Sequence, residues 1–408
     1  MFVVLLFPDI FLKPAVLQFD QRQGSSDGGA LLLKAADRRY GLIGCLAGCL
    51  QDERQAGKVD HSLKELLAQR VFSIACGYPD ANDAARLAAD PIHKMLLDRD
   101  PDAGRDLASQ PTLSRFENAI GVKELYRLSE ALAASVMQRH AQRLRGRVRR
   151  VTLDLDPTDD ATHGAQQLSF FNRHYDTRCY LPVMGFVSFN DEAEPYLCAA
   201  VLRPGNVTAA AGAVGILRRL MQLIRRFLPG VCIRVRLDGG FAHPQLLAFL
   251  DAEPGVEYVV AMAKNAVLRR KAKRAMRQAR KLSRRSGKTE HVYKEANYAA
   301  KTWPRERRIL IKAEVVRADG KALEVVRFDG AAAGHVLGIE VQDHPFAAKM
   351  IEADLAPVLR WKSEIGSRGA RLRYGSRVAG GWQQDQRGCD CEYENDCILH
   401  GSIFLSSV

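Results

Sequence analysis

Aspartates follow two apolar, strand-like stretches of this sequence. Asp154 and Asp156 close the segment 149–156, where apolar and polar residues alternate with the period of two that is typical of a β-strand. Asp238 ends a second such segment, 232–237. Carboxylate oxygens are the ligands that Mg²⁺ and Mn²⁺ prefer, and carboxylates at strand ends can hold the metal ions of a phosphoryl-transfer site. Asp156 and Asp238 are therefore candidate catalytic and metal-ligating residues, with Asp154 as the alternative first acid.

Each aspartate alone has an ordinary explanation, since Asp-Gly is a turn dipeptide and Asp156 precedes Pro157. The order of the surrounding elements favours a site. The periodicity predicts strands at 148–156, 181–189 and 196–202, a helix at 208–228, a strand at 231–238, a helix from Pro244 and a strand at 257–262. This is the order of a ribonuclease-H-like domain, in which the first and fourth strands are neighbours. We expect an α/β fold, a ribonuclease-H-like mixed sheet flanked by helices over 148–316.

An α-helical N-terminal domain is expected to precede this core, over residues 1–147. Ser62 and Glu65 have the spacing of a capping box, and Ser114 and Glu117 repeat it. A long helix is predicted over 121–146. Short helices with polar connections are typical of a DNA-binding module, and a helical cap domain is the alternative.

A strongly basic segment, 264–312, follows the last predicted core strand. Residues 269–285 hold ten Lys or Arg and no acid. These residues are Arg269, Arg270, Lys271, Lys273, Arg274, Arg277, Arg280, Lys281, Arg284 and Arg285. Such unopposed charge favours contact with a phosphate backbone over a merely solvated face. The net charge of +13 likewise indicates a polyanionic partner.

The length of 408 residues allows two or three domains, and 47% hydrophobic residues indicate a globular chain. Nine cysteines, an odd count, favour a reduced compartment. No apolar run reaches the ~18 residues that a membrane span requires, and the start lacks the basic region of a signal peptide. We expect a cytoplasmic protein without a membrane partner.

Several motifs occur in an order that resembles the DDE transposases of bacterial insertion sequences, most closely the family numbered thirteen-eighty. They are Gly28–Leu33, Gly77–Asp83, Leu107–Asn118, Leu153–Asp160, Thr162–Gln166, Phe170–Asn172, Tyr175–Asp176, Tyr180–Pro182, Leu237–Phe241 and Tyr258–Val260. The resemblance implies a ribonuclease-H-like core, dependence on Mg²⁺ (or Mn²⁺), and cut-and-paste transposition. It implies double-stranded DNA as partner, both terminal inverted repeats and target DNA, a homodimer on that DNA, and association with the nucleoid. Asp156 matches the first catalytic acid of the family and Asp238 the second.

The third acid of such enzymes, a Glu in a C-terminal Arg-Gly-Asp-x-Glu-Asn-Arg-like helix, has no counterpart here. Glu364, which follows Arg360, is a weak candidate. Residues 317–408 are expected to form an atypical tail, and we hypothesise that a frameshift replaced the sequence after about Val316 and inactivated the enzyme. Two alternatives to an active transposase stay open. One is a catalytically dead DNA-binding protein that regulates transposition, and the other is an unrelated ribonuclease-H-like nuclease.

Overall fold

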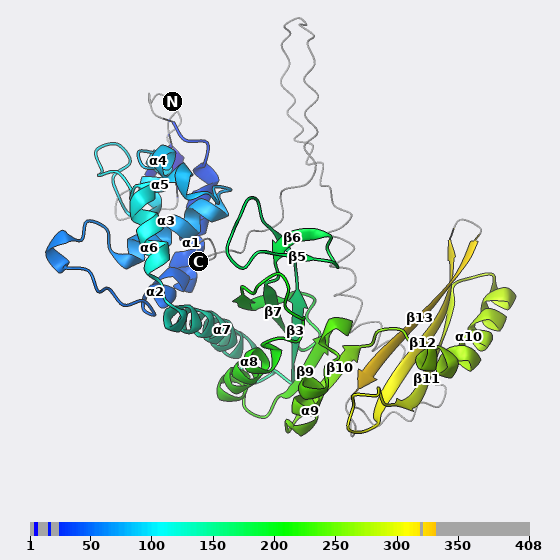
Figure 1. Cartoon of the computed structure of the whole chain (residues 1–408). Helices are drawn as coiled ribbons and strands as arrows, with labels where there is room; N and C mark the ends of the chain where they lie inside the picture. Colours follow the sequence, from blue (N-terminus) through cyan, green and yellow to red (C-terminus); the bar gives the residue numbers. More distant parts are fainter. Residues whose placement is uncertain (1–3, 7–14, 18–23, 319–320, 332–408) are drawn as a thin grey trace, which may run out of the picture. The chain divides into compact units, whose positions relative to one another are not determined.

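The computed structural model describes residues 4–6, 15–17, 24–318 and 321–331 (Figure 1). The described residues belong to one compact unit of the chain. Its largest element is an eight-stranded mixed sheet with the strand order β11-β12-β13-β10-β9-β3-β7-β8. The expectations for Glu364 and for the tail from residue 332 onward lie outside the described residues.

Five strands form the part of the sheet that the sequence predicted. They are β3 (Arg150–Pro157), β7 (Val183–Phe189), β8 (Tyr196–Val201), β9 (Cys232–Leu237) and β10 (Val256–Ala261). β3, β7 and β8 form an antiparallel meander, while β9 runs parallel to β3 and β10 parallel to β9. The predicted neighbourhood of the first and fourth strands is therefore confirmed, and the order β10-β9-β3-β7-β8 is that of a ribonuclease-H-like domain.

The connections of this core are helical, as the periodicity predicted. Helix α8 (Ala213–Phe227) joins β8 to β9, and α9 (Pro244–Ala252) joins β9 to β10. Alternate residues of β3, including Val151, Leu153 and Leu155, are buried in one large core together with the apolar side of α8. Burial of a large aliphatic side chain contributes roughly 1.5–3 kcal/mol, so these residues fix which face of β3 turns inward.

Helices dominate the segment before β3. They are η1 (Gly28–Ala30), α1 (Leu31–Tyr40), α2 (Leu42–Ala47), η2 (Ala56–Lys58), α3 (Leu63–Ala75), η3 (Ala81–Asp83), α4 (Ala84–Leu87), α5 (Pro91–Leu96), α6 (Gln110–Ala119) and α7 (Val122–Leu144). Two short strands, β1 (Val4–Leu6) and β2 (Ala15–Leu17), pair antiparallel ahead of them. The helices enclose a core of their own, and α7 contributes Leu128 to it and Met137 to the core of the sheet.

One of the two predicted capping boxes is confirmed. Ser62 begins α3, its Oγ accepts from the Glu65 amide at 3.2 Å, and Glu65 Oε2 accepts from the Ser62 amide at 2.8 Å. The box at Ser114 was wrong, because α6 already starts at Gln110. Proline is favoured in the first turn of a helix, where its missing N–H is not needed. Pro111 accordingly lies in the first turn of α6.

The sheet continues beyond the predicted core. Helix α10 (Ala266–Ser286) is followed by β11 (Glu290–Tyr298), β12 (Arg307–Ala318) and β13 (Lys321–Ala331), which form an antiparallel meander. β13 then pairs antiparallel with β10, through Val259–Ala261. The sheet thus runs past residue 316, where the sequence suggested a domain boundary, because β13 belongs to the same sheet. Its partner in the core lies far back in the sequence, which local periodicity does not report.

A second, small sheet lies between β3 and β7 in the sequence. Its strands β4 (Asp160–Ala161), β5 (Phe170–Asn172) and β6 (Thr177–Tyr180) have the order β4-β6-β5. Just beyond β6, the Leu181 amide donates to the Arg203 carbonyl at 3.0 Å, and Tyr180 forms a bridge with Pro204. The small sheet is thus joined to the start of β7 and to the chain that follows β8.

Candidate active site

The register of two neighbouring parallel strands brings the predicted acids together. On β3 and β9, Leu155 lies opposite Leu237. The next residues are Asp156 and Asp238, and Asp238 keeps an extended backbone with φ −76° and ψ 178°. Neighbouring strands are about 4.8 Å apart. The fold therefore places Asp156 and Asp238 side by side where β3 and β9 end.

An ion pair two residues earlier shows which face the two acids share. Arg236 donates from Nε to Asp154 Oδ1 and from Nη2 to Asp154 Oδ2, each at 2.6 Å. Side chains two residues apart on a strand point to the same face. Asp156 and Asp238 accordingly project from the same face as this pair. Asp154, the alternative first acid, is engaged by a bidentate arginine, so Asp156 is the better candidate.

The chain turns tightly after Asp238. Asp238 Oδ1 accepts from the Gly240 amide at 2.9 Å and so caps the short helix η4 (Gly239–Phe241). A Cβ at Gly240 would lie 2.8 Å from Ala209 Cβ and 3.2 Å from Asp238 Oδ1. Glycine is needed there for the close approach of the two chain segments, not for an unusual φ. Asp238 and Gly239 thus form a turn, and Asp238 remains a candidate metal ligand within it.

Tyr175 lies beside the paired acids, which the sequence did not reveal. Its hydroxyl donates to the Pro157 carbonyl at 3.2 Å. Burial raises the pKa of Tyr175 to about 12, and the negative charges of Asp156, Asp159 and Asp238 add to this effect. The hydroxyl is therefore protonated at neutral pH. Tyr175 fixes the turn between β5 and β6 to the end of β3.

The described residues do not supply a third ligand. Among them, no group of three or more His, Cys, Asp or Glu side chains is placed to hold a metal ion. Asp156 and Asp238 together offer four carboxylate oxygens, a donor set that suits Mg²⁺ or Mn²⁺ and does not suit a thiolate-preferring metal. The pair fits part of a magnesium site and needs a further oxygen ligand to complete it.

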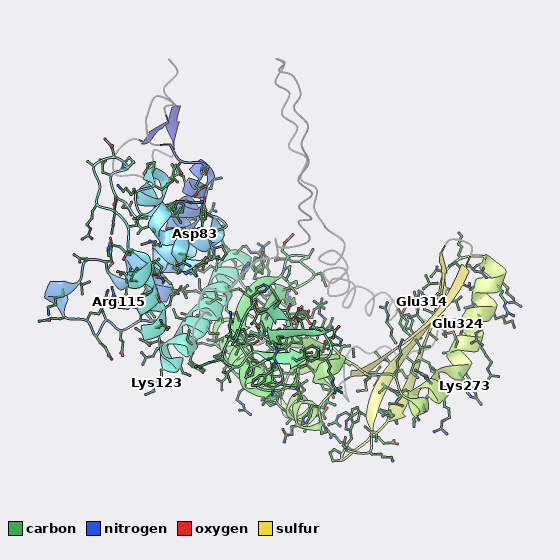
Figure 2. All side chains as sticks on the ribbon, turned by 45° about the horizontal axis from the view of Figure 1, so that its top comes forward. Asp83, Arg115, Lys123, Lys273, Glu314 and Glu324 are labelled. Carbon is green, nitrogen blue, oxygen red and sulfur yellow. The ribbon has the colours of Figure 1, made fainter. Side chains whose placement is uncertain are left out.

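All ten predicted basic residues lie on α10. The helix begins at Asn265, whose side chain accepts from the Leu268 amide at 3.0 Å, and ends at Gly287 with φ 71°. Its buried side packs on β11, β12 and β13 through Leu268, Ala272, Ala275, Met276, Ala279 and Ser283. The basic residues are exposed, apart from the half-buried Lys271. Figure 2 shows Lys273 of α10 and, on the neighbouring strands, Glu314 and Glu324.

A groove runs along one side of α10. It encloses about 530 Å³ and is lined by Arg269, Lys273, Arg277 and Arg280, with Glu324 of β13 on its other side. Arg280 is held by Glu324 through two hydrogen bonds of 2.5 and 2.6 Å. The span from Arg269 to Arg280 is about 16 Å at 1.5 Å per helical residue. That length matches roughly five nucleotides of one DNA strand.

A buried carboxylate ties this basic extension to the core. Asp251 of α9 accepts from the Tyr258 hydroxyl at 2.6 Å and from Arg307 Nη2 at 2.8 Å, and Arg305 pairs with it at 2.5 Å. Burial alone would raise the pKa of Asp251, but these three donors outweigh burial and lower it. Tyr298 and Trp303 pack edge to face nearby, with ring centroids 5.5 Å apart. Both rings pack in the apolar cluster that includes Leu268 of α10 and Ile309 of β12.

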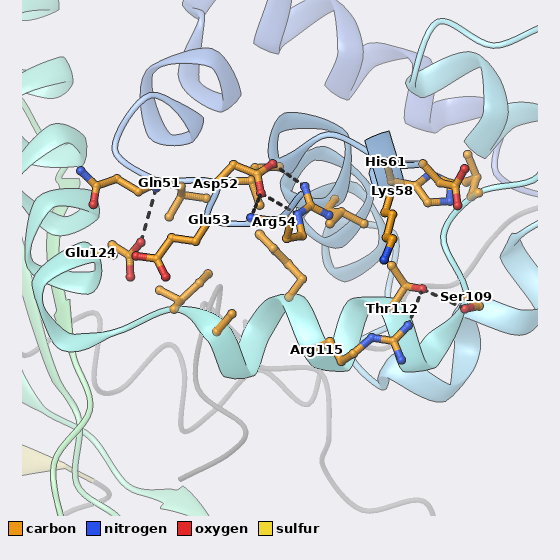
Figure 3. A pocket seen from close by; sticks show the side chains of 18 residues that line it. Gln51, Asp52, Glu53, Arg54, Lys58, His61, Ser109, Thr112, Arg115 and Glu124 are labelled. Atoms are coloured by element: carbon orange, nitrogen blue, oxygen red, sulfur yellow. Dashed lines mark hydrogen bonds and ion pairs between the residues drawn. The ribbon is translucent and has the colours of Figure 1, made fainter. Parts of the chain in front are cut away.

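A larger cavity, of about 880 Å³, lies among the N-terminal helices (Figure 3). It is lined by Ser109, just before α6, and by Thr112 and Arg115 of α6. Asp52 and Arg54 line it from the opposite loop. Asp52 and Arg54 are paired with each other at 2.6 Å. This cavity contains neither Asp156 nor Asp238, so it is separate from the candidate active site.

The strand order and the paired carboxylates at its centre define the class of ribonuclease-H-like proteins. Within that class, the family model described as "Transposase DDE domain group 1" matches residues 7–328. The chain belongs to this family of DDE transposases. The match passes Val316 and ends inside β13, in agreement with the sheet. A comparison with curated proteins finds no match.

Two observations concern the cysteines and the helices of the described residues. Cys45, Cys49, Cys76, Cys179, Cys198 and Cys232, the cysteines of the described residues, are free thiols. None of the helices in the described ranges combines the length and apolar character that spanning a bilayer requires.

Proposed function

We propose that this chain is a transposase that binds the terminal inverted repeats of an insertion sequence and cuts and rejoins DNA there. The observation that carries the proposal is the register of β3 and β9, which sets Asp156 beside Asp238. Membership of the DDE transposase family supports it.

In this proposal Asp156 and Asp238 hold Mg²⁺ or Mn²⁺. When bound, such ions supply a polarised water or hydroxyl and neutralise charge on the phosphate. The protein's own part is positional. The buried β3 and β9 hold the two carboxylates at a fixed spacing, Gly240 orients the Asp238 side chain through its amide, and Tyr175 packs against the end of β3. Preorganised charges of this kind need little rearrangement during the reaction.

Helix α10 supplies the contact with the DNA backbone. Its cations position the duplex and read no sequence, because phosphate contacts carry no base information. If the four α10 cations that line the groove each neutralise one phosphate, log Kobs should fall against log salt concentration with a slope of about −3.6. The N-terminal helices, over residues 1–147, are proposed to bind DNA as well. The proposal includes a homodimer on DNA, because two element ends must be held together. It also includes a location in the cytoplasm, on the nucleoid.

The test of backbone contact is a salt titration of binding to a short duplex. Lys273→Glu with Arg277→Glu should weaken binding and make the slope shallower by about 2. Arg218→Glu with Arg226→Glu is the matched control, because both residues are exposed cations on α8, outside the groove. An equal loss of slope in the control would show that net charge matters and α10 does not.

The test of chemistry uses a supercoiled plasmid that carries this chain's gene with its flanking DNA. The active transposase predicts Mg²⁺-dependent nicking at the element ends, lost in Asp156→Asn and in Asp238→Asn. Glu194→Gln is the control, because Glu194 is exposed in the turn after β7, at the opposite end of β3. Nicking without preference for the ends would favour the unrelated nuclease.

A catalytically dead regulator is the second candidate, and one observation favours it. Among the described residues, no three His, Cys, Asp or Glu side chains are grouped so that they could hold a metal ion. End-specific binding without nicking at any Mg²⁺ or Mn²⁺ concentration would establish this alternative. The frameshift hypothesis concerns residues beyond the end of the family match at 328. Translation of the downstream DNA in the other two frames tests it, because the hypothesis predicts the Glu-containing helix in one of them.

A further inference from the structure

Large apolar side chains are exposed on β5 of the small sheet and just before it. Leu168, Phe170 and Phe171 are 51%, 39% and 52% exposed. A single exposed apolar residue is ordinary on a protein surface, whereas a cluster indicates a contact surface. These three lie within four consecutive residues, so the cluster requires an explanation.

The pairing of β5 with β6 shows what accompanies the exposed rings. Phe170 lies opposite the buried Cys179, on the other face of the strand from Phe171. Phe171 lies opposite Arg178, and both are exposed. Directly opposite residues of an antiparallel pair share one face. The outward face of the small sheet therefore presents an aromatic ring next to a cation.

The backbone under this face is held in place. Leu168 has φ 61°, a left-handed conformation that is uncommon and costly for a leucine. The Gly205 amide donates to the Leu168 carbonyl at 3.3 Å, and Asn172 Nδ2 donates to the Gly205 carbonyl at 2.8 Å. A Cβ at Gly205 would lie 2.0 Å from the Cys179 carbonyl oxygen. These contacts hold the segment around Leu168 in one conformation beneath the exposed face.

The face lies within reach of the reaction. Tyr175 lies in the turn between β5 and β6, four residues after Phe171. Its hydroxyl donates to the carbonyl of Pro157, the residue after Asp156. Four residues span at most roughly 14 Å, so the Cα of Phe171 lies no farther than this from the Cα of Tyr175. At 3.4 Å per nucleotide, that distance covers about four nucleotides of one strand.

We propose that the outward face of the small sheet binds unpaired bases of the DNA strand end at the cleavage point, with Phe171 stacked on a base and Arg178 on the neighbouring phosphate. The proposal rests on the proposed function as a transposase. Two properties of the face select this occupant: a flat ring beside a positive charge, and continuity with the acids. Single-stranded nucleic acid is recognised by this combination of stacking and backbone charge.

The experiment measures binding of a short synthetic duplex with a 3′ tail of about four unpaired nucleotides, against the same duplex fully paired. One tail base is 2-aminopurine, whose fluorescence reports stacking. Phe171→Ala should weaken binding of the tailed duplex about 5- to 150-fold and abolish the fluorescence quench, with little change for the paired duplex. Phe171→Trp should keep both properties. Val122→Ala, on the exposed start of α7, is the matched control.

The outcomes separate this inference from the proposed function. If the wild type binds both duplexes equally and Phe171→Ala changes nothing, the stacking surface is refuted while the transposase proposal stands. If the wild type binds neither duplex, the proposed function fails with it. If Phe171→Ala instead alters only the association state of the protein in the absence of DNA, the face is a protein interface and the inference is overturned. A thermal melt of each variant confirms that the fold is intact.

Discussion

Replacing Arg236 by methionine tests how the face of the paired acids is built. Arg236 and Asp154 are 8% and 14% exposed and make two charge-assisted hydrogen bonds of 2.6 Å. Such bonds contribute about 1.5–3 kcal/mol each, and breaking a buried pair costs about 3–5 kcal/mol. Partial exposure favours the lower end, so we expect a loss of about 3 kcal/mol for Arg236→Met.

The expected loss corresponds to a decrease of about 6–12 °C in melting temperature, at about 2–4 °C per kcal/mol. Differential scanning calorimetry measures it. The loss should exceed that of Asp154→Leu, for a reason the register provides. Arg236→Met leaves Asp154 on the face that already carries Asp156 and Asp238, whereas Asp154→Leu leaves a cation there. Added Mg²⁺ should raise the melting temperature of Arg236→Met more than that of the wild type.

The double variant Asp154→Leu/Arg236→Met completes the cycle. Replacing both members of a buried ion pair by apolar residues is often neutral, so the double variant should melt above Arg236→Met. An unchanged melting temperature for Arg236→Met would refute the reasoning, because the pair would then carry no net stabilisation. Equal losses in the two single variants would refute the argument from like charges.

Three further perturbations follow from the contacts. Burial, followed by the charge of Arg143, lowers the pKa of His140 to about 4 from 6.5. The contribution of neutral His140 to stability is therefore full above about pH 6.5 and is lost as the pH falls to about 4. Thermal melts of His140→Phe should lack this part of the acid dependence. The raised pKa of Tyr175, about 12 against 10.0, contributes stability that is full below pH 10 and is lost as the pH rises to about 12, so alkaline melts of Tyr175→Phe should be flatter. Gly205→Ala would collide with the Cys179 carbonyl, and hydrogen exchange of the amides of 170–180 should quicken severalfold.

The sequence was sufficient for the central strands because their information is local. In β3 the alternation of apolar residues identifies the buried face, and the elements between β3 and β9 identify their order. The partner of Arg236 could not be predicted, since Asp154 lies 82 residues away. Tyr175 was visible only as part of a family motif, because its place beside the acids depends on the small sheet.

That the sheet continues past Val316 was hidden in the sequence for a similar reason. In β13 apolar and polar residues stand on both faces, as in Glu324-Val325-Val326-Arg327, so no period of two appears. Pairing with β10 decides that this segment is a strand, and the pairing partner is not encoded nearby. The basic segment was easier to recognise, because its ten cations lie close together in the sequence; Asn265 and Gly287 mark the ends of the helix that carries them.

The pairing of β13 with β10 also bears on aggregation of the chain. Without β13 the core sheet would end at β10, whose central residues Tyr258-Val259-Val260 are apolar and whose backbone groups would lack partners on that side. A bare apolar edge recruits strands from other molecules. With β13 in place, the edge passes to β11, which carries Glu290, His291, Lys294 and Glu295 along its length. A fragment of the chain that stops at Val316 is therefore expected to aggregate, whereas one that includes residue 331 keeps the protective charged edge.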